Sequence, residues 1–257
     1  MNTSALKFYN DLASSYRLIY QDFDGAVQRQ GRVLDKVIRR FHPPGKKLAL
    51  LDCSCGIGTQ AVGLAQYNYE VHATDLSPRA VREARKVAKR FGASISLGVA
   101  DFRELSRQVK GLFDVVISCD NSLPHLLTDR DLLSGLRNIY SKLKPGGLFL
   151  LGVRDYDSLL KTRPDFTPPT VKRDSLGERV YFQVWDWQKG KNIYTVHLFL
   201  LRRIGRNWKT QCHTTRYRAM SRKELTALMK KSGFTGIRWL MPKETGFFQP
   251  LSVAFRK

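Results

Sequence analysis

A glycine-rich turn has the residue types of a nucleotide-binding loop. Residues 51–59 read LDCSCGIGT, and they stand between a short apolar run and a segment with helical spacing. Gly56 and Gly58 would let the backbone approach a ligand closely, where free N–H groups of a helix N-terminus point outward. Because a lone glycine-rich turn is weak evidence, its interpretation depends on the residues that accompany it.

Two acids follow at the distances that a nucleotide ligand requires. Asp75 ends the next strand-like segment, 17 residues after Gly58, where an acid suits a ribose diol. Asp101 ends the third such segment and is placed to accept from the exocyclic amine of adenine. A dinucleotide fold is the competing interpretation, but Ala61 stands where its third glycine belongs. The pattern therefore favours an adenosyl ligand other than a dinucleotide.

The elements that would position these residues alternate between strand and helix. This alternation predicts a parallel sheet with helices on both faces. The expected strands are 48–53, 70–74, 95–99, 112–118 and 148–153, and the expected helices are 59–67, 78–91 and 128–143. A final helix over 221–231 and strands over 236–241 and 249–255 complete a seven-stranded sheet.

Two further segments flank or interrupt this core. Residues 5–41 have the spacing of two amphipathic helices with a polar break at 21–25, and Pro43 and Pro44 would end the second. Residues 155–178 are expected to form a loop, followed by a three-stranded antiparallel meander over 179–187, 192–203 and 208–218. We therefore expect one α/β domain with a Rossmann-like, doubly wound sheet. Its parts are an N-terminal helical cap (1–45), a core (46–154 and 218–257) and an inserted β-meander (155–217).

Several motifs together resemble one enzyme family. Besides the turn at 52–59, they are DNSLPHL at 120–126, VRDYD at 153–157, and the N-terminal segments FYNDLA at 8–13 and IYQD at 19–22. With them the chain resembles class I S-adenosylmethionine-dependent methyltransferases, and more narrowly the glycine/sarcosine N-methyltransferase group. The resemblance implies methyl transfer to a small molecule, with the amine nitrogen of an amino acid or related carboxylate as the expected acceptor.

The resemblance also implies which residues bind S-adenosylmethionine. Gly56 and the neighbouring backbone would hold the methionine part, Asp75 the ribose, and Asp101 with the Phe102 backbone the adenine. Arg29 would bind the cofactor carboxylate. The alternatives are an alignment shifted by one residue, onto Gln30, and an Arg29 that is only an exposed helix charge. The full set of expected cofactor-binding residues is Asp52, Cys53, Gly56, Gly58, Asp75, Leu76, Asp101, Phe102, Cys119, Arg29 and Tyr9.

The acceptor is expected at the carboxyl ends of the strands, as in other open α/β sheets. By resemblance, Arg154 and Asn121 would hold its carboxylate, although Arg154 can instead pair with Asp155 or Asp157. The remaining expected acceptor-site residues are His125, which can also simply satisfy backbone groups, and the aromatic residues Tyr20 and Tyr217. We expect no dedicated general base, because the sulfonium is already a strong electrophile. Trp185 and Trp187 are assigned to the meander core or a subunit contact.

The charge of the chain supports a different function. Lys and Arg total 44 against 22 Asp and Glu, and ten of these cations fall between Asp186 and Glu224, where no acid occurs. Such a surface attracts polyanions without specificity, and it makes an RNA- or DNA-modifying methyltransferase the alternative. A Pro-Pro-Tyr type motif is missing after the fourth strand, which argues against it. A non-catalytic cofactor-binding protein is the third class, disfavoured by the complete set of motif acids.

Composition limits the remaining possibilities. The four cysteines, at 53, 55, 119 and 212, form no CxxC pair, so we expect reduced thiols and no metal site. No apolar stretch is long enough to span a bilayer, and the first residues lack the features of a secretory signal. We therefore expect a cytoplasmic protein without a membrane span, and leave a homo-oligomer open.

Overall fold

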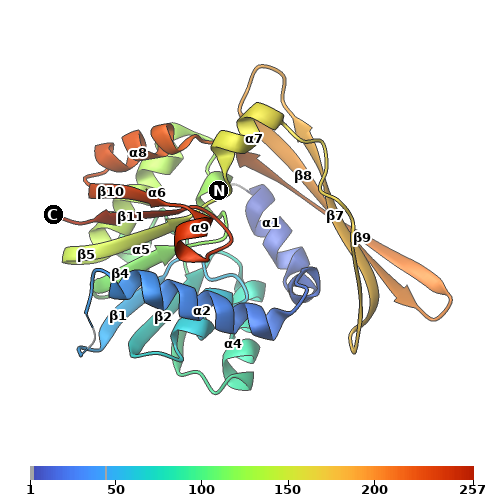
Figure 1. The fold of residues 1–257 in the computed structure, drawn as a ribbon, viewed down its shortest axis with the longest axis horizontal. Coiled ribbons are helices and arrows are strands. Elements are labelled where there is room, and N and C mark those ends of the chain that lie inside the picture. The colour runs from blue at the N-terminus through green and yellow to red at the C-terminus, as the bar shows by residue number, and fades with distance from the viewer. Residues whose placement is uncertain (1–2, 44) are drawn as a thin grey trace.

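A seven-stranded mixed sheet forms the centre of the computed structural model, which describes residues 3–43 and 45–257 (Figure 1). Pro44, one of the two prolines expected to end the second helix, lies outside the described residues. Across the sheet, the strands are β10 (Thr235–Leu240), β11 (Leu251–Phe255), β5 (Leu143–Gly152), β4 (Phe113–Ser118), β1 (Leu48–Asp52), β2 (Tyr69–Asp75) and β3 (Ile95–Val99). The predicted Rossmann-like sheet is confirmed.

The register of the parallel strands brings their carboxyl ends to one edge. Asp52 at the end of β1 pairs with Ala73 of β2, and Asp75 at the end of β2 pairs with Val99 of β3. On the other side, Ser118 at the end of β4 pairs with Leu151 of β5. The loops after β1 to β5 therefore start close together, as expected of the ligand edge of an open parallel sheet.

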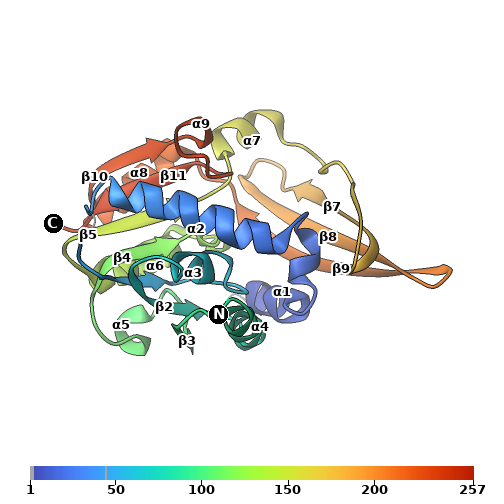
Figure 2. The ribbon, with the colours of Figure 1, turned by 60° about the horizontal axis from the view of Figure 1, so that its bottom comes forward.

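Helices cover both faces of the sheet (Figure 2). One apolar cluster packs α2 (Phe23–Arg39) and α3 (Thr59–Leu64) against one face, and α4 (Pro78–Arg90) joins α2 in a smaller cluster. On the other face lie α5 (Leu105–Gln108), α6 (Asp129–Lys142) and α8 (Arg222–Lys231). The one-turn elements η2 (Leu123–His125) and α9 (Pro242–Thr245) belong to loops at the ligand edge.

A second, antiparallel sheet stands beside the core and has one strand more than expected. It consists of β6 (Thr170–Asp174), β7 (Gly177–Trp187), β8 (Ile193–Ile204) and β9 (Asn207–Arg218), in that order. The expectation of a loop throughout 155–178 was wrong, because this segment contains both β6 and α7 (Tyr156–Thr162). β6 is a short, largely exposed edge strand, so its pairing with β7 rather than local propensity produces it.

The first helix of the N-terminal cap lies between the two sheets. α1 (Thr3–Leu12) packs against β9, and Figure 1 shows it between the core and the second sheet. A short turn, η1 (Tyr16–Ile19), then leads to α2. The break expected at 21–25 falls earlier, because the Asp22 side chain accepts a hydrogen bond from Gly25 N at 2.9 Å and thereby starts α2. Among the described residues no helix combines the length and apolar character of a membrane span.

Two glycines let α2 and α3 touch directly, and this contact gives a prediction. A Cβ added at Gly31 would lie 2.4 Å from the backbone carbonyl of Gly63. Alanine normally stabilises a helix interior by about 1 kcal/mol relative to glycine. Here we expect Gly31→Ala to reduce the free energy of unfolding by about 1–3 kcal/mol, the usual cost of overpacking. Urea denaturation measures it, with the exposed α2 substitution Gln28→Ala as the control. Equal midpoints for wild type and Gly31→Ala would contradict the close contact.

Candidate active site

A cavity opens at the carboxyl ends of β1 to β4 and encloses about 780 Å³, including its open mouth. Residues that follow four different strands line it, together with tyrosines from α1, η1 and the residue after η1. Of the predicted site residues, it contains Tyr9, Tyr20, Cys53, Gly56, Asp75, Leu76, Asp101, Phe102, Cys119 and His125. The topology thus brings together most of the cofactor residues that spacing and resemblance predicted.

The glycine turn has the backbone that the sequence required. Gly56 and Gly58 have φ values of +52° and +92°, in the region that favours glycine. A Cβ at Gly56 would meet nothing within 4 Å, so open space lies above that residue. A Cβ at Gly58 would lie 3.3 Å from Ala84 Cβ, so this glycine serves the packing of α3 against α4 and does not line the cavity.

Asp75 connects the turn to the end of β2. Its Oδ2 accepts from Gly56 N at 2.9 Å and its Oδ1 accepts from Ser77 N at 2.8 Å. Burial raises the pKa of this carboxyl, against the lowering effect of the two backbone donors. Since each carboxylate oxygen can accept more than one hydrogen bond, Asp75 can hold the turn and still accept from a ligand in the cavity.

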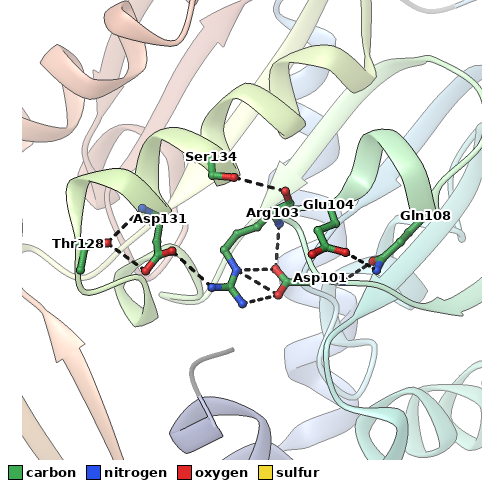
Figure 3. Close-up of polar contacts among 7 residues, drawn as sticks. All are labelled: Asp101, Arg103, Glu104, Gln108, Thr128, Asp131 and Ser134. Atoms are coloured by element: carbon green, nitrogen blue, oxygen red, sulfur yellow. Dashed lines mark hydrogen bonds and ion pairs between the residues drawn. The ribbon is translucent and has the colours of Figure 1, made fainter.

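Asp101 has a partner that the sequence did not suggest. Figure 3 shows the guanidinium of Arg103 facing the Asp101 carboxylate, with Nε 3.0 Å from Oδ1. The same guanidinium lies 3.6 Å from an Asp131 oxygen at the start of α6. The other Asp131 oxygen accepts a hydrogen bond from Thr128 Oγ1. Arg103 therefore ties the loop after β3 to α6. The adenine contact assigned to Asp101 stays a prediction. Arg103 already fixes the position of the carboxylate that would make this contact.

Three of the predicted cofactor residues do not line this cavity. Besides Gly58, Asp52 lies buried beneath the turn, where Oδ1 accepts from Ser54 N at 3.2 Å and burial raises its pKa to about 7. Arg29 is exposed, pairs with Asp22 at 3.1 Å and lines a second cavity instead. Gln30, the other position considered for the arginine, is buried and accepts from Gln60 Nε2 at 2.7 Å. The structure does not place Arg29 at the glycine turn.

The second cavity adjoins the first, between the core and the antiparallel sheet. It contains the predicted acceptor-site residues Asn121, Arg154, Tyr20 and Tyr217. The two cavities share four lining residues, Tyr9, Tyr16, Tyr20 and Asp120. We call these four residues the junction, because a group passing between ligands in the two cavities would pass there.

Arg154 is a half-buried cation whose direct side-chain contacts are neutral groups. It donates to Tyr194 Oη at 3.2 Å and to Gln183 Oε1 at 3.1 Å. Its guanidinium carbon lies 4.8 Å from the ring centre of Trp185 and 5.4 Å from that of Tyr217. Within the described part of the chain, no carboxylate lies within ion-pairing distance of it.

The alternative role considered for Arg154 is contradicted by the same region. Asp155 and Asp157 both pair with Arg222, at 3.0 and 2.8 Å. The two acids are therefore used to attach the start of α8 to α7, and they leave the Arg154 guanidinium facing the cavity.

Asn121 has a donor available beside Arg154. Its Oδ1 accepts from Arg154 N at 3.2 Å and from Tyr156 Oη at 2.9 Å. Its side chain is buried, and Nδ2 has no partner among the described residues. An unsatisfied buried donor of this kind costs about 1–3 kcal/mol, so it indicates a position built for a hydrogen-bond acceptor from outside.

His125 forms part of the cavity wall, and its ring is neutral. Its Nε2 lies 2.9 Å from Tyr9 Oη, its Nδ1 lies 3.3 Å from Thr215 Oγ1, and its ring lies 4.3 Å from that of Tyr217. Burial lowers the pKa of His125 to about 3. Burial also holds the pKa of the Tyr9 hydroxyl well above its usual value, so neither group is charged at neutral pH.

Sequence reasoning missed the second-sheet residues that surround Arg154. Gln183 and Trp185 project from one face of β7, and Tyr194 of β8 pairs in register with Tyr217 of β9. Trp185 was assigned to the meander core or a subunit contact. It is buried in an apolar cluster, and its ring also lies against the Arg154 guanidinium. The alternation within β7 was a usable signal that Gln183 and Trp185 share a face. Nothing local indicated that this face meets the core.

Comparison with known proteins identifies part of the chain. Residues 50–147 match the family described as a methyltransferase domain. This segment includes the glycine turn, Asp75 and Asp101, but it ends before Arg154 and the second sheet. The family match therefore covers the glycine turn and the ends of β2 to β4, including Asn121 and His125, and leaves Arg154 and the second sheet outside it.

Two curated relatives are glycine/sarcosine N-methyltransferases. The chain is 31% identical over 140 residues to that of Parasynechococcus marenigrum, covering 54% of this chain and 48% of the relative. It is 31% identical over 139 residues to that of Halorhodospira halochloris, covering 54% and 50%. The chain thus matches about half the length of these curated relatives.

The likeness to solved structures extends over nearly the whole chain. An amino pentose methyltransferase from Micromonospora echinaspora, solved with S-adenosylmethionine bound, superposes with a TM-score of 0.73 over 95% of both chains. At 17% identity, this likeness concerns the fold. The core, the second sheet and the N-terminal helices therefore form an arrangement already seen among class I methyltransferases.

Proposed function

Because residues 50–147 form an S-adenosylmethionine-dependent methyltransferase domain, we propose that the protein methylates the amine nitrogen of an amino acid or related small carboxylate. The acceptor would lie in the second cavity, with its nitrogen at the junction and its carboxylate on Arg154. The curated relatives named above support this acceptor class, although they share only about half their length with this chain.

The observation that carries the proposal is the environment of Arg154. A half-buried guanidinium without an acidic partner is costly, because a charge taken out of water needs compensation. An incoming carboxylate supplies it, and arginine binds carboxylates through two parallel hydrogen bonds. The free Nδ2 of Asn121 offers a further donor beside Arg154. A neutral acceptor would leave the charge of Arg154 uncompensated.

The residues of the first cavity fit an adenosyl cofactor. Open space above Gly56 accommodates a ligand against the backbone of the turn, and Asp75 faces the same cavity. Gly56 and its neighbours would hold the methionine part, Asp75 the ribose hydroxyls, and the loop of Asp101 and Phe102 the adenine. The bound cofactor supplies a methyl carbon activated by a positively charged sulfur.

The chain's own contribution to rate is mainly orientation. Two reactants held in line can gain about 7–11 kcal/mol over their encounter in water. Arg154 and Asn121 would fix the acceptor at one end, and the aromatic rings of Tyr9, Tyr16 and Tyr20 would surround its nitrogen at the junction. These rings also exclude water and can face a cationic group favourably.

A panel of acceptors tests the proposal. Amino acids, their N-methylated forms, amines without a carboxylate, amino sugars and RNA would be compared by the release of S-adenosylhomocysteine. We expect turnover with a small amino acid or a related amino carboxylate, and little with the others. Turnover of carboxylate-free amines or of an amino sugar at equal rates would contradict the acceptor class while leaving the methyltransferase assignment intact.

The alternative acceptor, a nucleic acid, rests on the net charge of +22. Part of the basic stretch between Asp186 and Glu224 is already neutralised within the protein. Arg218 pairs with Asp129 and Glu224, and Arg222 pairs with Asp155 and Asp157. Apart from Lys223 in α8, the remaining cations of the stretch are spread along the second sheet, and Arg203 among them pairs with Glu178.

We therefore expect only weak, sequence-independent binding of RNA by this surface. The dissociation constant should be about 10⁻⁴–10⁻⁶ M at physiological salt and should rise steeply with ionic strength, as for non-specific phosphate contacts. Fluorescence anisotropy with two unrelated RNA sequences at several salt concentrations measures it. A nanomolar complex with one sequence that survives moderate salt would instead favour the nucleic-acid acceptor.

A further inference from the structure

The junction contains one carboxylate, that of Asp120. Asp120 is the second residue after β4 and lines both cavities, whereas Asn121 and Arg154 line only the second. The other three junction residues are tyrosines from the N-terminal cap. Among the described residues, Asp120 is thus the one ionisable acid present where the two cavities meet.

The backbone at this position is held in an uncommon conformation. Asp120 and Asn121 have φ values of +58° and +68°, and neither is a glycine. Non-glycine residues in the left-handed region cost about 1–3 kcal/mol each, and they persist where the surrounding structure requires them. Aspartate and asparagine tolerate this region better than other residues. The double turn directs consecutive side chains, one to the junction and one beside Arg154.

Asp120 is weakly engaged by the protein itself. Gln249 Nε2 donates to its Oδ1 at 3.4 Å, and no basic side chain of residues 3–43 and 45–257 lies within ion-pairing distance. Burial raises the pKa of the Asp120 carboxyl, and Arg154 opposes that rise. A carboxylate whose pKa is raised is a stronger base, which favours proton uptake.

An amino acid acceptor needs such a group. At neutral pH its nitrogen is an ammonium, which has no lone pair and cannot attack a methyl carbon. A proton must therefore leave before the new bond forms. We propose that Asp120 binds the acceptor's ammonium group at the junction and takes up the proton that this nitrogen loses before methyl transfer. The inference rests on the proposed function and replaces our expectation that no general base is used.

The step balances in atoms and charge. The ammonium gives one proton to an Asp120 oxygen, which leaves a neutral amine and a neutral carboxyl. The amine nitrogen then forms its bond to the methyl carbon while the carbon–sulfur bond breaks and its electron pair stays on sulfur. The product is a methylated ammonium, and the Asp120 proton returns to solvent after release. No further reactant is required.

The arrangement also defines the acceptor. Arg154 provides a cation in the second cavity and Asp120 provides an anion at the junction, so the site is complementary to a zwitterion. The carboxylate of an α-amino acid would face Arg154, and its ammonium group would face Asp120. Arg154 also disfavours a second cation nearby, which promotes loss of the ammonium proton once Asp120 can receive it.

The ionisable groups around Asp120 influence the pKa of its carboxyl. They are Tyr9 of α1, Tyr16 of η1, Tyr20 after η1, Tyr217 of β9 and Arg154 after β5. Burial keeps the pKa of each of these tyrosines above its usual value. The tyrosines therefore stay neutral and Arg154 stays charged, so Asp120 is the group of this set whose ionisation controls the step, and activity should rise with pH as its carboxyl ionises.

Asp120→Asn tests the proposal, because asparagine keeps the shape and accepts the left-handed backbone. We expect kcat/KM for an amino acid to fall about a hundredfold or more at pH 7, the usual contribution of a positioned base. The deficit should shrink as pH rises toward the pKa of the acceptor amine, since solvent then supplies the neutral form. Asp186→Asn, an exposed carboxylate paired with His197 on the second sheet, is the matched control.

A second variant and a binding measurement keep the outcomes distinct. Asp120→Gly also suits the backbone and should show the same pH-dependent deficit, while both variants bind S-adenosylmethionine as wild type does. If Asp120→Asn keeps activity within threefold at pH 7, the inference is wrong although the proposed function stands. A deficit equal at all pH values would also overturn it, by assigning Asp120 to binding alone. Absence of amino acid turnover in wild type would instead contradict the proposed function.

Discussion

Arg154→Lys is expected to lower turnover of the acceptor by about a hundredfold while affinity for S-adenosylmethionine stays within about threefold. Lysine keeps the charge but loses the planar group with several fixed donors. In the structure that group contacts Tyr194 and Gln183 and stacks on Trp185 at the same time. An ammonium cannot reproduce this set, so the acceptor would be misplaced by about 1 Å, which can cost about a hundredfold in rate.

The control for this variant is an exposed arginine outside both cavities that also contacts a tryptophan ring and a side-chain amide. Arg163 lies over Trp187 at 5.3 Å and donates to Asn192. Arg163→Lys should therefore leave turnover close to wild type. Two titrations on each protein, one of cofactor and one of acceptor, separate binding from turnover. If Arg154→Lys turns over the acceptor as fast as wild type, Arg154 does not orient the acceptor, and the carboxylate assignment loses its main support.

Asp75→Ala is expected to weaken S-adenosylmethionine binding by about 1.5–3 kcal/mol, the scale of a lost hydrogen bond to a charged group. Two causes act together. The ribose loses its acceptor, and Gly56 N and Ser77 N lose the carboxylate that holds the turn against β2. Calorimetric titration of the cofactor measures the change.

Glu70→Ala on the same strand is the matched control, because Glu70 is exposed and lies outside the cavities. It should bind the cofactor as wild type does. Unchanged affinity in Asp75→Ala would show that the end of β2 contributes nothing to binding. Tight binding of NAD by wild type, without binding of S-adenosylmethionine, would contradict the cofactor assignment as a whole.

The cofactor side of the site was predictable because it depends on local patterns. Each of its residues follows a short apolar strand, and parallel strands place their carboxyl ends at one edge. Gly56, Asp75 and Asp101 therefore came together as their spacing predicted. Arg103 escaped notice because its partners are Asp101 in the loop after β3 and Asp131 in the first turn of α6, which only the packing of α6 brings together.

The acceptor side was less predictable because it depends on how the second sheet meets the core. Gln183, Trp185 and Tyr194 reach Arg154 from strands far along the chain, and no local pattern sets that contact. The strand pattern did predict β7, β8 and β9. The edge strand β6 was missed since its residues alternate poorly and are mostly exposed. The sequence analysis treated Asp120 only as part of a motif, because the sequence does not reveal the left-handed backbone that directs its side chain to the junction.

A matched pair of acceptors tests the central claim most directly. Wild-type protein would be given glycine or glycinamide with S-adenosylmethionine carrying an isotopically labelled methyl group, and mass spectrometry would locate the label. We expect label on the nitrogen of glycine, with kcat/KM at least about tenfold above that of glycinamide, since the amide lacks the charge that Arg154 binds. Equal labelling of glycine and glycinamide, or label found only on added RNA, would contradict the account.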